Sequence, residues 1–393
     1  MNRFDYVLVG GGLQNALIAA ALVHRERGAR VAVVEAQATL GGNHLWCFHA
    51  LDIPELAVPF VEPFVVQRWP RYRVHFPAYS KMIDEPYAAV TSSALHERLS
   101  TLATMGQLEL RLGTPARGVE PGRVELASGE ALTADVVIDA RGPERFAERA
   151  AIGYQKFVGL ELRVTPESAP REPMLMDCTV EQVGGLRFAY VLPLAPDRVL
   201  VEDTYFSDDA GLDDAALEAE ILRYAARSGL VVHSVLRRER GVLPLPATPP
   251  VRTDNPAGLV RGGYQGGWFH PTTGYSFPLA VRLAAVIADS SLEELPSRLA
   301  ELALRTRRQQ RFAALLNRLL FRGFAPAQRY STCERFYRLP AGTVRRFYAL
   351  SLTPSDRARI VCGRPPRGIT ARGLLSALAP ASAAHHPEPG TSP

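Results

Sequence analysis

Short apolar runs separated by a glycine turn open the chain. Residues 4–9 form a β-rich apolar run, residues 10–12 are all glycine, and residues 16–23 suit a buried helix. Residues 30–34 predict a second strand, with Glu35 at its end. This order of strand, glycine turn, helix, strand and acid predicts the first βαβ unit of a dinucleotide-binding fold. The alternative is an ordinary strand–turn–helix unit with a tight glycine bend.

The turn itself has the residues that phosphate binding requires. Gly10, Gly11 and Gly12 let the backbone approach a pyrophosphate, and the following helix presents free N–H groups and the positive end of its dipole. Glu35 is placed to accept hydrogen bonds from ribose hydroxyls. Asn15 stands where the usual G-x-G-x-x-G fingerprint has its third glycine, so the fingerprint is imperfect.

Weaker patterns follow this unit. Prolines and aromatic residues are frequent over 51–84, and residues 67–76 alternate like a single strand. Residues 91–101 begin with N-cap residues and predict a helix. Residues 108–112 and 123–126 also alternate, and we expect these two runs to pair as a small antiparallel hairpin.

Two further glycine loops are candidates for ligand contacts. Gly41 and Gly42 follow the second strand, where a loop passes close to a bound dinucleotide. Asp139 ends another buried strand and is followed by Arg141 and Gly142, at the edge where α/β sheets bind ligands. A surface turn and a plain exit from the strand are the respective alternatives.

The second half of the chain changes its pattern twice. Runs at 188–192 and 199–206 flank a loop with turn signals, and residues 213–228 predict an amphipathic helix beside a mostly antiparallel sheet. An apolar helix is then predicted over 279–288. It is preceded by residues that suit an anion-receiving helix N-terminus: His270, Pro271, Thr272, Thr273 and Gly274.

These patterns predict two domains of a globular protein. We expect a discontinuous dinucleotide-binding domain of residues 1–50, 85–150 and 255–300, and a substrate domain of residues 51–84 and 151–254. Hydrophobic residues are 47% and charged residues 22% of the chain, as in globular proteins. The four cysteines are scattered, so neither a disulfide framework nor a zinc site is indicated, and we expect no metal.

Positive charge is concentrated near the C-terminus. Between Arg305 and Arg372 there are sixteen arginines, no lysine and two acidic residues. A basic helical region over 301–379 can meet an anionic membrane or nucleic acid, and we favour the membrane because no nucleic-acid-binding module accompanies it. A solvated helical face is the alternative. We expect a cytoplasmic chain without a spanning helix, and a disordered tail over 380–393.

The chain resembles the bacterial flavoprotein lycopene β-cyclases. The matching stretches run in order to about residue 370, and they are residues 5–15, 41–46, 137–142, 201–205 and 269–278. The last two, VEDTY and FHPTTGYSFP, are distinctive. In that family an Asn follows the glycines where a third Gly would otherwise stand, so Asn15 counts for the match.

The resemblance implies a fold and an activity. The fold is α/β, with a Rossmann-like FAD-binding domain of the glutathione-reductase and aromatic-hydroxylase type, an antiparallel-sheet substrate domain and a C-terminal helical region. The activity is cyclisation of the ψ ends of lycopene to β-ionone rings, through γ-carotene to β-carotene, with reduced FAD and no net redox change. NAD(P)H is the implied indirect reductant. The implied partners are lycopene or a related acyclic carotenoid, the membrane surface and neighbouring carotenoid-pathway enzymes.

The resemblance also points to the acid. The carboxylate of the Glu-Asp-Thr motif is the family's candidate acid/base, which here is Glu202. Asp203 is adjacent on a predicted strand, so the two side chains point to opposite faces and only one faces a given pocket. A carboxyl in an apolar pocket can donate or receive a proton, because burial raises its pKa.

Two other functions are compatible with these patterns. One is a flavin monooxygenase or polyprenyl reductase of a related fold, and the other is a non-catalytic lipid-binding flavoprotein. Aromatic hydroxylases of this fold carry Asp-Gly with a downstream Ser and Arg where this chain has residues 139–143, DARGP, which counts against them. The product separates the three: an isomer of equal mass, an oxygenated or reduced compound, or none.

Overall fold

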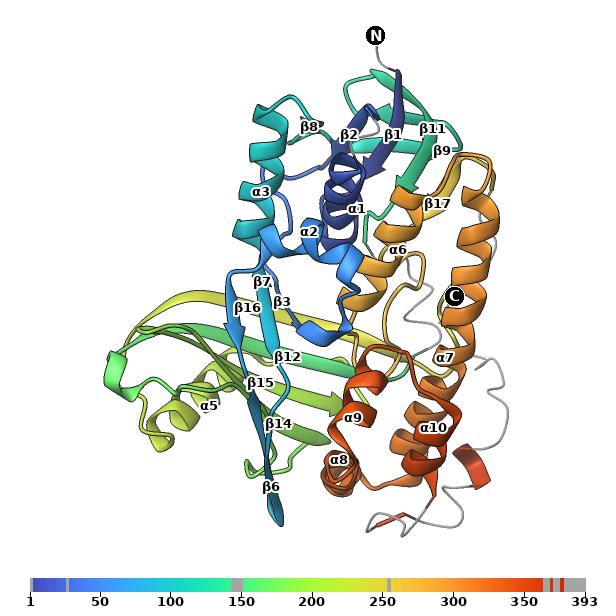
Figure 1. The fold of residues 1–393 in the computed structure, drawn as a ribbon. Helices are drawn as coiled ribbons and strands as arrows, with labels where there is room; N and C mark the ends of the chain where they lie inside the picture. The colour runs from blue at the N-terminus through green and yellow to red at the C-terminus, as the bar shows by residue number, and fades with distance from the viewer. Residues whose placement is uncertain are drawn as a thin grey trace, which may run out of the picture.

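The predicted βαβ unit forms the centre of a seven-stranded sheet in the computed structural model (Figure 1), which describes residues 3–25, 28–142, 151–252, 256–362, 368–369 and 375–377. The strands run in the order β8 (Glu109–Arg111), β2 (Val31–Val34), β1 (Arg3–Val9), β11 (Ala131–Asp139), β10 (Arg123–Leu126) and β9 (Ala116–Glu120), with β17 (Leu259–Arg261) beside β11. β1 is parallel to both β2 and β11, and β17 is parallel to β11. The carboxyl ends of these four strands therefore meet at one edge.

One hairpin differs from the prediction. β8 pairs in parallel with β2, and the antiparallel partner of β10 is β9. The two alternating runs at 108–112 and 123–126 therefore do not pair with each other. Alternation indicates a strand but does not select its neighbour. Burial selects it here, because Leu108 belongs to the core around the first helix, whereas Val124 belongs to the core on the other face of the sheet.

Three helices cover one face of this first sheet. They are α1 (Leu13–His24), α3 (Ser92–Thr104) and α6 (Phe277–Asp289), and they share one hydrophobic core. Residues Leu13 to Leu22 of α1 are all buried, which confirms the buried helix expected from its continuous apolar run. Thr91 caps α3 by accepting a hydrogen bond from the Ala94 N–H, as the sequence predicts.

A short helical segment also joins this core. It comprises η1 (Ala50–Asp52), η2 (Glu55–Ala57), α2 (Val58–Val61) and η3 (Glu62–Phe64). Phe60, Val61 and Phe64 are buried with the side chains of α1 and α3. The sequence placed residues 51–84 in the substrate domain, whereas the part of this range up to Phe64 packs on the dinucleotide side.

The second sheet also has seven strands. Their order is β16 (Val232–Pro246), β12 (Ala151–Val164), β15 (Arg198–Ser207), β14 (Leu186–Ala195), β13 (Met174–Asp177), β5 (Tyr72–Phe76) and β6 (Tyr79–Ile83). Every pair is antiparallel except β13 with β5. The short helix η4 (Pro166–Ser168) follows β12, and α5 (Asp214–Arg227) packs against β12 and β15 with Asp213 as its N-cap. The predicted antiparallel sheet and amphipathic helix are thus both present.

The predicted single strand over 67–76 is divided between two sheets. β4 (Gln67–Trp69) joins β3 (Leu45–His49) and β7 (Tyr87–Thr91) in a three-stranded sheet, while β5 belongs to the large second sheet. Pro70 lies at the break, where it cannot donate a ladder hydrogen bond. The indole N–H of Trp69 donates to the Pro193 carbonyl at 3.2 Å, which fixes the bend against β14.

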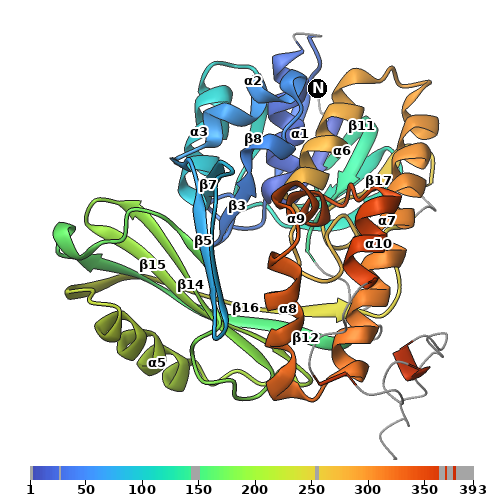
Figure 2. The ribbon, with the colours of Figure 1, turned by 60° about the horizontal axis from the view of Figure 1, so that its bottom comes forward.

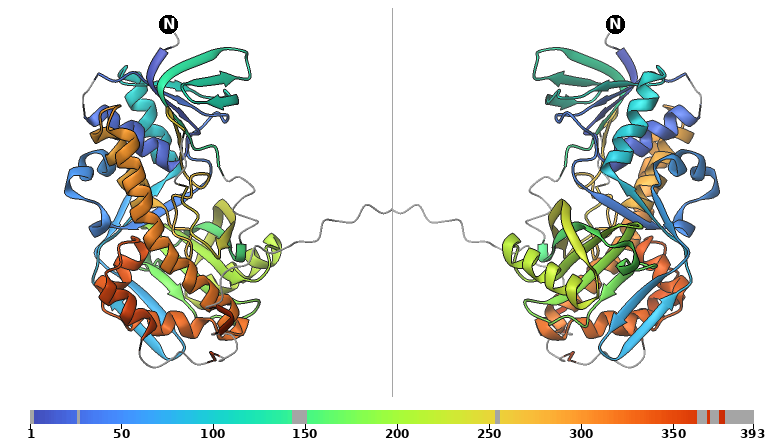
Figure 3. Two further views of the ribbon diagram at one scale, coloured as in Figure 1. Left: turned by 90° about the vertical axis from the view of Figure 1, so that its right-hand side faces the viewer. Right: turned by 90° about the vertical axis from the view of Figure 1, so that its left-hand side faces the viewer.

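The C-terminal helices connect the two large sheets. The long helix α7 (Leu295–Gly323) packs on α6 at one end and on β12 and β16 at the other, and Figure 3 shows it running along both parts. After η5 (Pro326–Gln328), the short helices α8 (Tyr330–Tyr337), α9 (Ala341–Tyr348) and α10 (Pro354–Val361) lie beside it (Figure 2). Among the described residues, no helix is both long and apolar enough to cross a bilayer. The tail over 380–393 lies outside the described residues.

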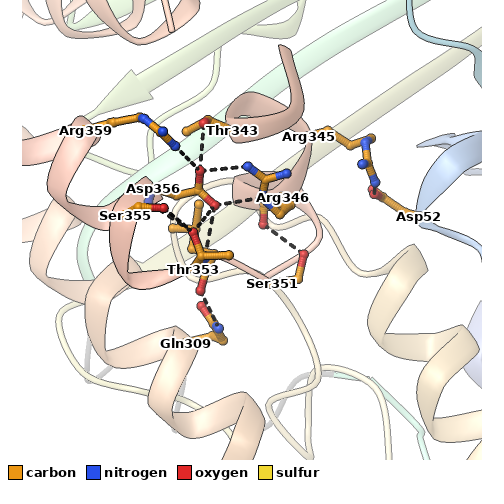
Figure 4. Close-up of polar contacts among 11 residues, drawn as sticks. Asp52, Gln309, Thr343, Arg345, Arg346, Ser351, Thr353, Ser355, Asp356 and Arg359 are labelled. Carbon is orange, nitrogen blue, oxygen red and sulfur yellow. Dashed lines mark hydrogen bonds and ion pairs between the residues drawn. The ribbon is translucent and has the colours of Figure 1, made fainter. Parts of the chain in front are cut away.

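One buried carboxylate holds the short helices together. Asp356 accepts hydrogen bonds from the Arg346 guanidinium at 2.7 and 2.8 Å and from the Thr353 N–H at 3.0 Å, as part of a capping box on α10 (Figure 4). The Arg346 guanidinium holds the pKa of this carboxyl well below its usual range. The neighbouring Arg345 pairs with Asp52 at 3.2 Å, which ties α9 to the segment packed on α1.

We expect Asp356→Asn to lower the free energy of unfolding by about 2–3 kcal/mol, the scale of losing hydrogen bonds to a charged group. Because the pKa of Asp356 is depressed in the folded state, its stabilisation is present above about pH 4 and is lost as the pH falls. The difference between the two proteins in urea unfolding should therefore shrink below about pH 4. Glu301→Gln, which removes an exposed ion pair with Arg305, is the control and should cost below about 0.5 kcal/mol. Equal losses in both variants would contradict this role of Asp356.

Candidate active site

One cavity of about 1110 Å³ lies where the two large sheets and the C-terminal helices meet. Glycine loops of the first sheet form one wall, β12, β14, β15 and β16 form a second, and α7 to α10 form a third. Most of the lining side chains are apolar or aromatic, among them Trp46, Tyr87, Phe157, Tyr190, Tyr275, Phe336 and Tyr348. Two carboxyl side chains also line it, Glu202 and Glu239.

The glycine turn has two closed positions and one open position. A Cβ on Gly10, whose φ is +97°, would lie 2.6 Å from the Ala140 carbonyl oxygen, and one on Gly11 would lie 2.3 Å from Leu40. A Cβ on Gly12 would meet nothing within 4 Å, and Gly12 lines the cavity. Gly12 is also the N-cap of α1 without any side-chain cap. Gly10 is thus required by the backbone of the turn, and a side chain on Gly11 would displace Leu40, whereas Gly12 keeps space free in the cavity.

Two polar side chains hold this turn. The Glu35 carboxylate accepts from the Gly11 N–H at 2.6 Å and from the Gln37 N–H at 2.8 Å. The Asn15 side-chain amide donates to the carbonyls of Val9 and Gly10 at 3.0 and 2.8 Å. Asn15 therefore shapes the turn from the position where the usual fingerprint has a glycine. The ribose contact expected of Glu35 stays a prediction.

The loop after β11 reaches the cavity at Gly142. Asp139 is buried and accepts from the Arg141 guanidinium at 2.8 and 2.9 Å, so this pair shapes the loop while neither side chain lines the cavity. The loop after β2 is similar, because a Cβ on Gly41 would lie 2.9 Å from Ser92, and neither Gly41 nor Gly42 lines the cavity. Trp46 and His44, just beyond, do line it.

The loop before α6 presents Thr272, Thr273 and Gly274 to the cavity. His270 lies behind them, fully buried, where its Nδ1 accepts from the Thr272 N–H at 3.1 Å and its ring packs against Phe347. Burial lowers the pKa of His270 to about 3, so this side chain is neutral at pH 7. His270 and Pro271 shape the loop and do not line the cavity.

These loops fit the FAD that the family resemblance implies. The N-termini of α1 and α6 both lack a side-chain cap and both border the cavity, which suits a diphosphate. The side chain of Gln14, in the first turn of α1, accepts a hydrogen bond from the Gly263 N–H at 2.9 Å. This bond joins the start of α1 to the loop that follows β17. Among the described residues, the buried Gln14 Nε2 and Asn15 Oδ1 have no hydrogen-bond partner, as expected where a polar ligand belongs.

The adjacent acids Glu202 and Asp203 face opposite sides of the second sheet. Glu202 lines the cavity and accepts a hydrogen bond from the Thr204 hydroxyl. Burial, and then the negative charge of Glu239, raise the pKa of Glu202 to about 8. Asp203 is bound by the Arg187 guanidinium at 2.7 and 2.9 Å on the other face. Burial raises the pKa of Asp203 while Arg187 opposes that rise.

The sequence reasoning missed Glu239. It lies on β16 and is bound at 2.8 Å by Arg237, which also binds Glu161 at 3.1 Å. Burial raises the pKa of Glu239, and the charge of Arg237 opposes that rise. An available signal was an acid among arginines in the run Arg237-Arg238-Glu239-Arg240-Gly241.

Similar solved structures define the class of fold. The chain superposes on a geranylgeranyl bacteriochlorophyll reductase-like protein of Thermoplasma acidophilum with a TM-score of 0.64 at 15% identity, covering 96% of each chain. It superposes on a probable FAD-dependent monooxygenase of Pseudomonas aeruginosa with a TM-score of 0.59 at 17% identity, covering 84% of this chain and 98% of that one. The predicted α/β architecture is thus confirmed as the fold of FAD-dependent oxygenases and reductases.

Sequence comparison then gives the family. The family model described as lycopene cyclase protein matches residues 5–372. The chain is 40% identical over 371 residues to a lycopene β-cyclase of Pseudescherichia vulneris, covering 92% of this chain and 94% of that protein. It is 37% identical over 373 residues to a lycopene β-cyclase of Pantoea ananas, covering 93% and 95%. The chain belongs to the lycopene cyclase family.

We expect Gly12→Val to remove bound FAD while the protein stays folded. No protein atom lies within 4 Å of the Cβ of this valine, so its side chain enters the part of the cavity in front of the N-terminus of α1. Gly118→Val is the matched control, because its Cβ would make ordinary contact with Glu125 at 3.7 Å in the same sheet, away from the cavity. Flavin absorbance per protein chain and thermal unfolding measure both effects. A folded Gly12→Val protein with one FAD per chain would disprove the placement.

Proposed function

We propose that this protein binds FAD and cyclises the ψ ends of lycopene to β-ionone rings, giving γ-carotene and then β-carotene without net redox change. The observation that carries this proposal is Glu202, a carboxyl facing an aromatic cavity that also borders the glycine turn. The bacterial relatives named lycopene β-cyclases support the substrate. In this proposal the first sheet holds the cofactor and the second sheet holds the end of the carotenoid.

Ring closure begins when a proton is added to a terminal C=C bond. An alkene is a poor base, so the donor must be a neutral acid that water does not reach. Glu202 meets this requirement, since a pKa of about 8 keeps its carboxyl mostly protonated at pH 7. The hydroxyl of Thr204 donates to Glu202 and therefore stabilises the carboxylate that is left after the proton has gone.

The cation that follows is stabilised by the walls of the cavity. Aromatic faces attract cations, by about 1–2 kcal/mol each when water is absent. The hydroxyls of Tyr87 and Tyr190 form a hydrogen bond with each other at 3.2 Å. Their rings are therefore available at the wall of the cavity near Glu202. Reduced FAD, recharged indirectly by NAD(P)H, would supply negative charge near the cation. A final proton loss sets the double bond of the ring.

The alternative, an FAD-dependent monooxygenase or reductase acting on a polyprenyl or aromatic lipid, has only the fold in its support. The solved structures of that kind are 14–18% identical to this chain. The nearly full-length relatives at 37–40% identity are named as cyclases.

We expect Glu202→Gln to retain FAD and to lose about 10²–10⁴-fold in the rate of ring formation, because the amide cannot donate a carboxylic proton. The wild-type protein, reduced once without oxygen, should convert many molecules of lycopene in deuterium oxide. Each new ring should carry one deuteron and no NAD(P)H should be consumed. Mass spectrometry of the extracted pigment and its absorbance measure these quantities.

Asp203→Asn is the matched comparison for this test, because Asp203 lies on the other face of the same strand. Asp203→Asn should lower the thermal stability of the protein more than it lowers the rate of ring formation. Near-normal rates in Glu202→Gln would refute Glu202 as the acid, and consumption of one NAD(P)H per ring would refute the non-redox reaction.

We also propose that the C-terminal helices dock the protein on a membrane, from which it draws its substrate. Many arginines of this region are not available for lipid: Arg329, Arg345 and Arg346 bind acidic groups inside the protein. Arg308 and Arg311 are exposed on α7. Val361 at the end of α10 is 51% exposed and also lines the cavity, so it marks a mouth beside α7. Docking there would also bring the protein near neighbouring carotenoid-pathway enzymes.

We expect the pair Arg308→Glu and Arg311→Glu to weaken binding to vesicles that contain anionic lipid by roughly tenfold or more, since each arginine near such a surface contributes about 1 kcal/mol. Wild-type binding should weaken with salt. The control is Arg117→Glu with Arg123→Glu, the same charge change on the exposed hairpin of β9 and β10. Vesicle sedimentation measures both. Equal binding of the two variants would exclude this face as the docking surface.

A further inference from the structure

Glu202 and Glu239 occupy one row across the second sheet. Gly159 on β12 lies between them, paired with Glu202 on β15 and with Glu239 on β16. Side chains that are directly opposite on neighbouring strands point to the same face, so both glutamates project to the cavity side. Their Cα atoms are two strand spacings apart, about 10 Å. The residue between them has no side chain.

The Glu239 side chain fills the space above this glycine. A Cβ on Gly159 would lie 3.1 Å from Glu239 Oε1 and 2.8 Å from its Cγ, and the second distance is closer than real side chains allow. Glu239 therefore leans over Gly159 toward Glu202, and its Oε1 is on that side. The other oxygen, Oε2, is bound by Arg237 at 2.8 Å. The glycine is thus the residue that lets the two carboxyl groups approach one another.

Arg237 gives the two carboxyl groups different electrostatic surroundings. Its guanidinium stabilises the ionised form of Glu239 and is itself fixed by Glu161 at 3.1 Å and by Asn43 at 2.8 Å. Glu202 has a hydroxyl donor, Thr204, and no cationic partner among the described residues. A carboxyl that burial keeps protonated and a carboxylate paired with a guanidinium, when both face the same cavity, can act as an acid and a base.

We propose that Glu239 is the second catalytic carboxylate, which removes the proton that ring closure releases. The inference rests on the proposed function. Glu202 loses its O–H proton to the terminal alkene carbon, where a C–H bond forms. Glu239 then takes a proton from the ring, and the electron pair of that C–H bond becomes the ring double bond. The proton returns across Gly159 to Glu202 and exchanges with water beside the partly exposed Arg237, so no co-reactant is consumed.

Most titratable groups packed around this pair stay neutral near pH 7, among them His49, whose pKa burial lowers to about 3, whereas burial raises the pKa of Asp52, which lies behind Tyr275 on the other side of the cavity, to about 7. Burial raises the pKa of Cys47 to about 12 and raises that of Tyr190 and Tyr87 well above its usual range, so these groups stay neutral. Burial and Arg237 lower the pKa of His44, which favours its uncharged form. Asp203 faces the opposite side with Arg187, and Glu161 is held by Arg237 and Arg198.

The test combines kinetics with three substitutions. The wild-type rate should be bell-shaped in pH, with Glu239 ionised and Glu202 protonated at the optimum. Glu239→Gln should lose about 10²–10³-fold in rate and the acidic limb of the profile. Its basic limb should move to lower pH, because removing the negative charge lowers the pKa of Glu202. Glu239→Asp should keep the acidic limb. Gly159→Ala, which displaces Glu239 without touching its chemistry, should reduce the rate with FAD still bound.

A second readout does not depend on carotenoid turnover. Burial raises the pKa of Asp52 to about 7, so its carboxyl contributes an infrared band that remains in every variant. A second band, from Glu202, should titrate in the wild-type protein, vanish in Glu202→Gln and titrate at lower pH in Glu239→Gln. If the wild-type protein makes no ring from lycopene but the band behaves in this way, the proposed function fails and the coupled pair stands. An unchanged pH profile and an unchanged band in Glu239→Gln, or a Gly159→Ala enzyme of wild-type rate, would overturn the assignment of Glu239.

Discussion

Exclusion of water from one cavity is the constraint on which the rest of this structure depends. A carboxyl keeps its proton near neutral pH only where the charged form is poorly solvated, and a carbocation persists only where no water adds to it. Neither large sheet encloses such a space alone. The first sheet contributes its glycine loops, the second its inner face, and α7 with the short helices lines the remaining side. The long helix α7 is therefore part of the site, because it packs on both sheets.

Charge is distributed around this cavity by strand alternation. Glu202 and Glu239 point inward, while Asp203 points outward, where Arg187 binds it. The arginines of the C-terminal region follow a related logic. Arg345 and Arg346 neutralise buried carboxylates that hold the short helices in place, as Figure 4 shows, and only part of the basic region remains for an external surface. The arginine-rich region of the sequence therefore has two parts in the fold: arginines that bind buried carboxylates and arginines on an exposed face.

Proteins that share this fold carry out different reactions. The fold is shared with FAD-dependent oxygenases and reductases at low identity, whereas the lycopene cyclase family shares its sequence with this chain over almost its whole length. Such a comparison locates function in the site and not in the architecture. In this chain the features that we propose to carry the chemistry are the carboxyl groups on β15 and β16 and the aromatic wall that they face.

The sequence alone determined the features that depend on neighbouring residues. The βαβ unit, the buried α1, the caps of α3 and α5 and the opposite directions of Glu202 and Asp203 all follow from local periodicity and local hydrogen bonding. The choice of neighbouring strands did not follow from the sequence. β8 pairs with β2 instead of β10, and β4 and β5 enter different sheets, because burial on a particular face decides pairing. Glu239 was missed for the same reason. Its relation to Glu202 passes through the register of β12, and through a glycine that gains its meaning only when both neighbouring strands are in place.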